Sequence, residues 1–109
     1  MSQQVIDELE NSLEASQADI DRLEVLKRLM KNPDYKLIID EFYLKEQAIR
    51  LTMCLDDPGM KHLQEDVLND LKAIAGFRRQ LGVIFQMGEV AIQAKADYQQ
   101  ELDEIRGEE

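Results

Sequence analysis

The side chains that could carry out chemistry are few and lie far apart in the sequence. His62 is the single histidine and Cys54 the single cysteine of the 109 residues. A zinc site needs three or four nitrogen or sulfur ligands close together, and a nucleophilic triad needs a base that a third group orients. The serines stand at positions 2, 12 and 16, far in sequence from His62. We therefore predict no catalytic residue, metal ligand or cofactor, and we expect that the chain is not an enzyme.

The remaining motifs with possible chemistry have structural explanations. The segment 56–59, Asp-Asp-Pro-Gly, resembles the start of a calcium loop but lacks the alternating ligands and the closing glutamate. Arg78 and Arg79, with Lys72, form the basic cluster, which we expect to contact the chain's own carboxylates. Cys54 lies in an apolar run and is predicted to be a small buried hydrophobe, and His62 is predicted to be exposed at a helix start.

The composition favours an acidic helical protein of one domain's length. The formal net charge is −10, 44% of the residues are hydrophobic, 6% are aromatic, and glycine and proline together number seven. The acidic charge argues against direct binding of nucleic acid or an anionic membrane. No run approaches the about 18 apolar residues of a membrane span. The first 16 residues have neither the basic nor the apolar part of a secretory signal, and one cysteine forms no internal disulfide.

The acidic charge is concentrated at the two ends of the chain. Residues 1–24 hold seven acids and one base, and residues 96–109 hold six acids and one base. Residues 25–95, in contrast, hold ten acids and eleven bases. One interpretation is that the ends are solvated and keep the protein soluble. The other is that they repel nucleic acid or bind a basic partner.

Two helix-breaking motifs divide the chain into three expected helices. Asn32-Pro33-Asp34 combines an N-cap, a proline suited to the first helical position and an acid at the positive end of the helix dipole. Pro58-Gly59 marks a second turn. We predict helices over roughly 3–31, 33–55 and 60–106. The fold class is all-α: an antiparallel αα-hairpin with a long third helix, and an N-terminal coiled-coil-like helix. The expected parts are residues 1–31 and 32–109.

The first helix carries a heptad pattern typical of a coiled-coil seam. Apolar residues recur with the 3.5-residue spacing of positions a and d, interrupted by Ser16 and Lys27. The candidate oligomer seam consists of Ile6, Leu9, Leu13, Ile20, Leu23 and Met30. The seam can pair within the chain or between chains, and both alternatives stay open here.

The third helix leaves an apolar stripe near its end that the second helix cannot cover. We predict this stripe as a candidate partner surface: Ala91, Ala94, Tyr98, Leu102 and Ile105. Either the first helix or another subunit covers it, so a homo-oligomer is expected. Gly76, Gly82 and Gly88 recur every six residues and do not share a face. They predict close approach of a neighbour or a bend, and we expect one continuous helix because no proline accompanies them.

Two stretches resemble a family of small helical proteins from tailed bacteriophages. The first is Asn32-Pro33-Asp34-Tyr35-Lys36, continuing through Glu41–Leu51 to Asp57-Pro58. The second is Asp70–Phe77 followed by Ile84–Gly88. The resemblance covers about residues 30–90, leaves out most of the heptad segment and contains no catalytic motif. It implies a virion or particle-assembly protein encoded among the morphogenesis genes, located in the host cytoplasm or the virion.

Two functions follow as hypotheses. The first is a structural or interaction protein that forms helical oligomers and binds another phage or host protein, with neither nucleic acid nor membrane as a direct partner. The alternative is an acidic inhibitor that occupies the basic site of a host nucleic-acid enzyme. The inhibitor requires a continuous strip of carboxylates, which forms only if the first helix folds back beside the end of the third.

Overall fold

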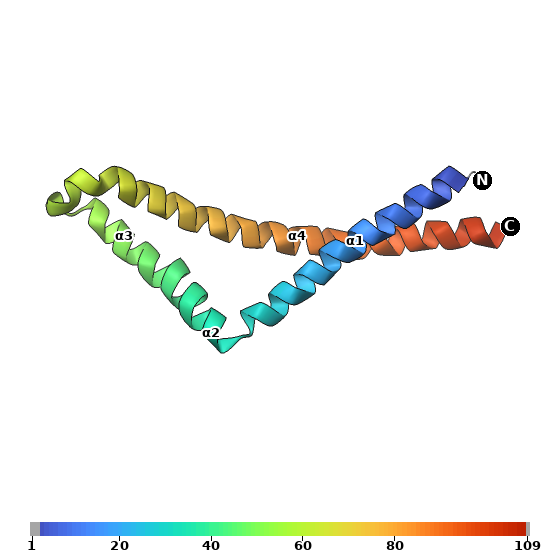
Figure 1. Cartoon of the computed structure of the whole chain (residues 1–109), viewed down its shortest axis with the longest axis horizontal. Helices are drawn as coiled ribbons and strands as arrows, with labels where there is room; N and C mark the ends of the chain where they lie inside the picture. The colour runs from blue at the N-terminus through green and yellow to red at the C-terminus, as the bar shows by residue number, and fades with distance from the viewer. Residues whose placement is uncertain (1–2, 109) are drawn as a thin grey trace. The chain divides into compact units, whose positions relative to one another are not determined.

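The computed structural model describes residues 3–108, which form helices and turns and no strand. This confirms the prediction of an all-α fold. The helical elements, shown in Figure 1, are α1 (Gln3–Met30), α2 (Pro33–Tyr35), the π-helix η1 (Lys36–Glu46), α3 (Gln47–Leu55), the 3-10 helix η2 (Pro58–Leu63) and α4 (Gln64–Glu108).

The break between α1 and α2 is produced by the predicted cap. The side-chain oxygen of Asn32 accepts hydrogen bonds from the backbone N–H groups of Asp34, at 2.8 Å, and Tyr35, at 3.2 Å. Pro33 occupies the first turn, where a missing N–H costs nothing because that group has no partner inside the helix. The expected second helix therefore begins where the sequence predicts, and α2, η1 and α3 follow one another without a gap from Pro33 to Leu55.

Much of this segment is a π-helix, which the sequence analysis did not predict. Over Lys36–Glu46 the backbone bonds span five residues instead of four, and the N–H of Gln47 still donates to the carbonyl of Phe42. The sequence holds a signal for this spacing, because the apolar triplet 37–39 is repeated five residues later at 42–44. A five-residue repeat places the corresponding residues of the two triplets closer to one face when the turn is wider than that of an α-helix.

The turn before α4 is also longer than predicted. Asp57 caps it, since its carboxylate accepts a hydrogen bond from the N–H of Gly59 at 2.9 Å. A 3-10 helix fills Pro58–Leu63, and the α-helix begins only at Gln64. The Gln64 side-chain amide donates to the carbonyl of Cys54 at 3.1 Å and to that of Met60 at 3.3 Å. These bonds hold the turn against the end of α3.

The chain forms two compact units that divide it differently from the expected ranges 1–31 and 32–109. The central unit is Lys27–Gly82, and the terminal unit combines Met1–Leu26 with Val83–Glu109. The physical reason is that α1 packs on the last part of α4, so segments from opposite ends of the sequence share one set of contacts. Helix α4 supplies residues to both units.

The core of the central unit lies between the segment 33–55 and the first part of α4. Leu44 and Leu51 are buried against Val67 and Ile74, and smaller half-buried groups such as Cys54 surround them. Tyr43 meets Phe77 edge to face, with ring centroids 5.6 Å apart at an interplanar angle of 88°. This packing joins the predicted second and third helices as a hairpin.

Helix α4 is continuous through its three glycines. A Cβ added at Gly82 would meet no atom within 4 Å, and one at Gly76 would come no nearer than 3.6 Å to the guanidinium of Arg79. Gly88 is different, because its added Cβ would lie 2.6 Å from the Cβ of Leu23. The predicted close approach is therefore confirmed at Gly88, and neither Gly76 nor Gly82 has such a reason.

Candidate interaction surfaces

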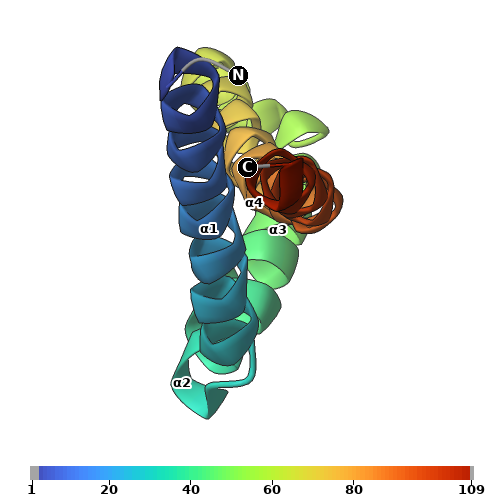
Figure 2. The ribbon, with the colours of Figure 1, turned by 90° about the vertical axis from the view of Figure 1, so that its right-hand side faces the viewer.

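The candidate seam of α1 faces the candidate partner surface of α4 inside the terminal unit. Ile6 and Leu9 are buried in one cluster with Leu102 and Ile105, and half-buried Leu13 and Tyr98 pack against them. Figures 1 and 2 show the first turns of α1 beside the last turns of α4. Of the two partners that the sequence leaves open for this part of the seam, the structure provides the internal one.

The seam follows the predicted register at first and then departs from it. Leu23 is only 1% exposed, and Ile20 is half-buried, as is Met30, which belongs to the central unit. Leu26, however, is buried, whereas Lys27, the predicted core position, is exposed. A straight α-helix has 3.6 residues per turn, so a pattern with a 3.5-residue period drifts around its surface. After several turns, the position next to the predicted one is therefore buried in its place.

The first two residues of the candidate partner surface are also covered within the terminal unit. Ala91 is buried and Ala94 half-buried, both on the side of α4 that carries Leu102 and Ile105. The five predicted residues therefore lie at least half-buried within this chain. Whether a second subunit also contacts them stays a prediction.

A groove opens in the terminal unit where the seam holds a serine. Ser16 is buried at a position that leucine would fill in a regular coil, and two of the α4 residues that line the groove, Ala91 and Ala94, are small. The groove measures about 280 Å³. It is lined by Ser16, Asp19, Gln86, Met87, Val90, Ala91 and Ala94. Val90 is 62% exposed, so this unit presents apolar area beside the groove.

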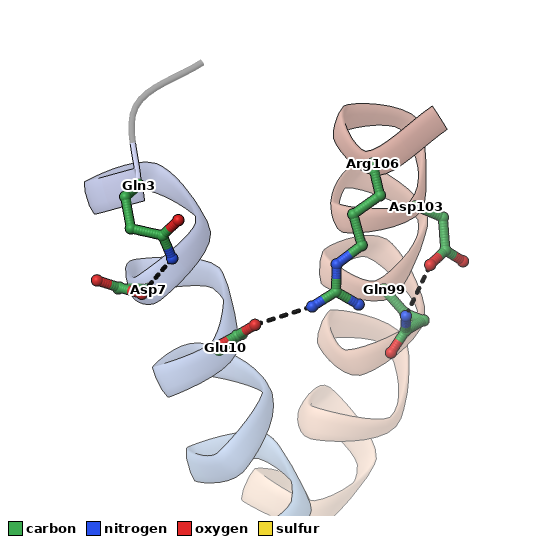
Figure 3. Close-up of polar contacts among 6 residues, drawn as sticks. All are labelled: Gln3, Asp7, Glu10, Gln99, Asp103 and Arg106. Atoms are coloured by element: carbon green, nitrogen blue, oxygen red, sulfur yellow. Dashed lines mark hydrogen bonds and ion pairs between the residues drawn. The ribbon is translucent and has the colours of Figure 1, made fainter. Parts of the chain in front are cut away.

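The terminal unit brings the two acidic segments together. It holds 14 acids and three bases, a net charge of −11, whereas the central unit holds nine acids and ten bases. Among residues 3–108, one ion pair joins the helices of this unit, between Arg106 and Glu10 at 2.8 Å (Figure 3). Lys95 also donates a hydrogen bond to Gln17 across them at 2.5 Å. Few of the carboxylates are therefore neutralised within the unit.

Glutamine amides, instead of cations, accompany many of these carboxylates. Six glutamines donate to an acid four residues later on the same helix, as Gln3 does to Asp7 and Gln99 to Asp103 in Figure 3. The other four pairs are Gln4–Glu8, Gln17–Asp21, Gln93–Asp97 and Gln100–Glu104. Each pair supports its helix by about 0.2–0.5 kcal/mol. A neutral donor leaves the full negative charge in place.

The central unit carries an apolar surface that the sequence analysis did not select. Five side chains of the segment 33–55 are 40–68% exposed on the helix: Leu37, Ile38, Phe42, Ile49 and Met53. We call this set the central apolar face. The sequence signal was present, because the segment has more apolar residues than one buried stripe requires. The guanidinium of Arg50 lies over the ring of Phe42, 5.9 Å from its centroid, and places Arg50 on this face as well.

The side chains that could take part in catalysis or metal binding occupy ordinary structural positions. His62 is exposed in η2, and Cys54 is a free, half-buried thiol in the central core. Within residues 3–108, no three His, Cys, Asp or Glu side chains are grouped closely enough to hold a metal ion. The hydroxyl of Tyr35 is buried without a hydrogen-bond partner. Burial first, and then the charge of Asp40, raise the pKa of this tyrosine above its ordinary value of 10.0.

The basic cluster has a different partner from the one expected. Arg78 donates a hydrogen bond to the backbone carbonyl of Leu44, near the junction of η1 and α3. In the described part of the chain, no carboxylate pairs with Arg78 or Arg79 within 4.0 Å. This hydrogen bond joins α4 to the segment 33–55, so the role of Arg78 there is structural.

Comparison of the chain with protein-family models, with curated proteins and with solved structures finds no match. The implied relationship to tailed-bacteriophage proteins therefore rests on the residue patterns quoted above and stays a prediction. In the part of the chain that the structure describes, no helix is both long and apolar enough to cross a membrane.

Proposed function

We propose that this chain is a non-enzymatic interaction protein that forms helical oligomers and binds another protein. The observation that carries the proposal is the central apolar face, where large side chains are 40–68% exposed on one helix. Each compact unit pairs only two long helical segments, so one stripe of each segment is covered and other apolar residues face outward. Large apolar side chains exposed together on one helix are typical of sites of protein association.

The cellular setting that we propose is the assembly of a bacteriophage particle. Its support is the resemblance of the patterns at 32–58 and 70–88 to small tailed-phage proteins. In this setting, the partner of the oligomer is a virion or assembly protein. The identity of the neighbouring genes tests this setting, since a position outside a morphogenesis cluster contradicts it.

Light scattering of the full chain tests the oligomer directly. We expect the measured mass to exceed that of one chain and to rise with concentration until the oligomer is complete. The reason is that association removes exposed apolar side chains from water, at about 25 cal/mol per Å². A mass that stays at one chain up to the highest attainable concentration would contradict the proposal.

A second candidate function is inhibition of a nucleic-acid enzyme through its basic site. The observation that favours it is the pairing of both acidic segments in the terminal unit, with 14 acids against three bases. This is the arrangement that a continuous strip of carboxylates requires. The carboxylates that accept hydrogen bonds from glutamine side chains stay charged. They are therefore available to arginine and lysine side chains of a partner.

The acidic residues of the last helical turns provide the test of this second function. Changing the six acids of 96–109 to their amides is expected to weaken inhibition of the host enzyme and to reduce its dependence on salt. The control changes three acids of the central unit, Glu65, Asp66 and Asp70, to amides, and the loss of inhibition is compared per carboxylate removed. An equal loss per carboxylate in the two variants would exclude the inhibitor function.

A further inference from the structure

Four of the five residues of the central apolar face are symmetrically spaced along the segment 33–55. Ile38 and Met53 stand near its two ends, and Phe42 and Ile49 stand nearer the middle, where Lys45 and Glu46 meet. Ile38 is 57% exposed, Met53 68%, Phe42 40% and Ile49 54%. Ile38 and Met53 are therefore equally far in sequence from the point between Lys45 and Glu46, and so are Phe42 and Ile49, whereas the counterpart of Leu37 is the half-buried Cys54. A surface of this kind can meet its own copy across a two-fold axis.

The charges on this face follow the same symmetry with opposite signs. A two-fold axis between Lys45 and Glu46 places two antiparallel copies of the helix in register. Counted in residues from the axis, Ile38 then corresponds to Met53 of the second copy, and Phe42 to its Ile49. Glu41 lies level with Arg50 of the second copy, and Lys45 with its Glu46. Each of these four charged residues is exposed. The pairing is isologous, so every favourable contact occurs twice.

The distribution of charge selects this face as the place where two copies meet. Each chain carries −10, to which the terminal unit contributes −11 and the central unit +1, so two copies repel one another at the terminal unit. The segment 33–55 holds four acids and three bases and is almost neutral. Apolar area and balanced charge thus coincide on one helix face.

We propose that the central apolar face binds the same face of a second copy of this chain, with the two segments 33–55 antiparallel. This inference deepens the proposed function, on which it rests, by naming the surface and the partner of the first association step. Apolar contacts supply the affinity, and the alternating charges fix the direction and register of the two helices.

Charge reversal in the full chain tests the pairing. Sedimentation equilibrium is expected to show a dimer for the wild type and a dissociation constant raised about tenfold or more by Glu41→Arg or by Arg50→Glu, because like charges then face each other twice. The double variant E41R/R50E restores opposite charges and is expected to dimerise within about threefold of the wild type. Mixing the two single variants is expected to give the heterodimer, in which every reversed charge meets its opposite.

The control reversal is Asp70→Arg, which changes the net charge as Glu41→Arg does at an exposed position of α4. It is expected to leave the dimer intact, and circular dichroism checks that all variants keep their helix content. An oligomer that is indifferent to both single reversals, or that Asp70→Arg weakens equally, overturns this inference and leaves the proposed function standing. A wild-type chain that stays monomeric overturns both.

Discussion

Replacing Leu23 with alanine is expected to lower the free energy of unfolding by about 2–5 kcal/mol, the usual range for removing a fully buried leucine side chain. Leu23 is 1% exposed and is the most deeply buried large side chain of the described residues. It sits on Gly88 of α4, so its loss opens a cavity between the two helices of the terminal unit. Urea unfolding followed by circular dichroism measures the change.

The control for this prediction is Val25→Ala on the same helix. Val25 is 53% exposed, so its truncation is expected to change stability by no more than about 0.5 kcal/mol. Amide hydrogen exchange assigns the loss to the terminal unit. If Leu23→Ala costs no more than Val25→Ala, then α1 is not packed on α4 through Leu23, and the description of the terminal unit is wrong.

Alanine at Gly88 and alanine at Gly82 are expected to change stability in opposite directions. Both substitutions improve helix propensity by about 1 kcal/mol. At Gly82 the new methyl group meets nothing within 4 Å, so the protein should become more stable by up to that amount. At Gly88 the new Cβ would lie 2.5 Å from the Leu23 Cδ2 and 2.6 Å from its Cβ.

The clash at Gly88 is not relieved by a rotation of the leucine side chain, because the Cβ of Leu23 is fixed to the backbone of α1. The two helices must move apart, and such overpacking costs about 1–3 kcal/mol. The net result is a loss of up to about 2 kcal/mol, which thermal unfolding of the two variants compares directly. Stabilisation by Gly88→Ala of the size seen for Gly82→Ala would show that no helix approaches α4 at this point.

The two breaks between the helices were predictable because local chemistry sets them. Asn32 caps through its own side chain, and Pro33 and Pro58 limit the backbone wherever they occur. The heptad spacing of α1 likewise predicted which residues are at least half-buried, from Ile6 to Leu23. Local signals of this kind need no knowledge of the rest of the fold.

The partner of α1 was not predictable, because an internal and an external helix require the same apolar seam. Ile6 and Leu9 satisfy either arrangement, and only the position of Leu102 and Ile105 against them distinguishes the two. The π-helix and the exposed face of Phe42 and Met53 were missed for another reason. The excess of apolar residues in this segment indicates that some of them require a contacting surface. The 3.6-residue period of an α-helix, however, does not reveal a repeat of five residues.

The central claim is that the two ends of one chain pair with each other, which leaves the central apolar face for a second copy. Spin labels attached to cysteines at positions 10 and 106, where Glu10 pairs with Arg106, test this claim. The labelled chain also carries Cys54→Ser, so that only the two introduced cysteines react. Loss of that exposed ion pair itself costs no more than about 1 kcal/mol. Dipolar spectroscopy should give one short distance that persists when labelled chain is diluted with excess unlabelled chain. Disappearance of that distance on dilution would show that the helices pair between chains and would contradict the account.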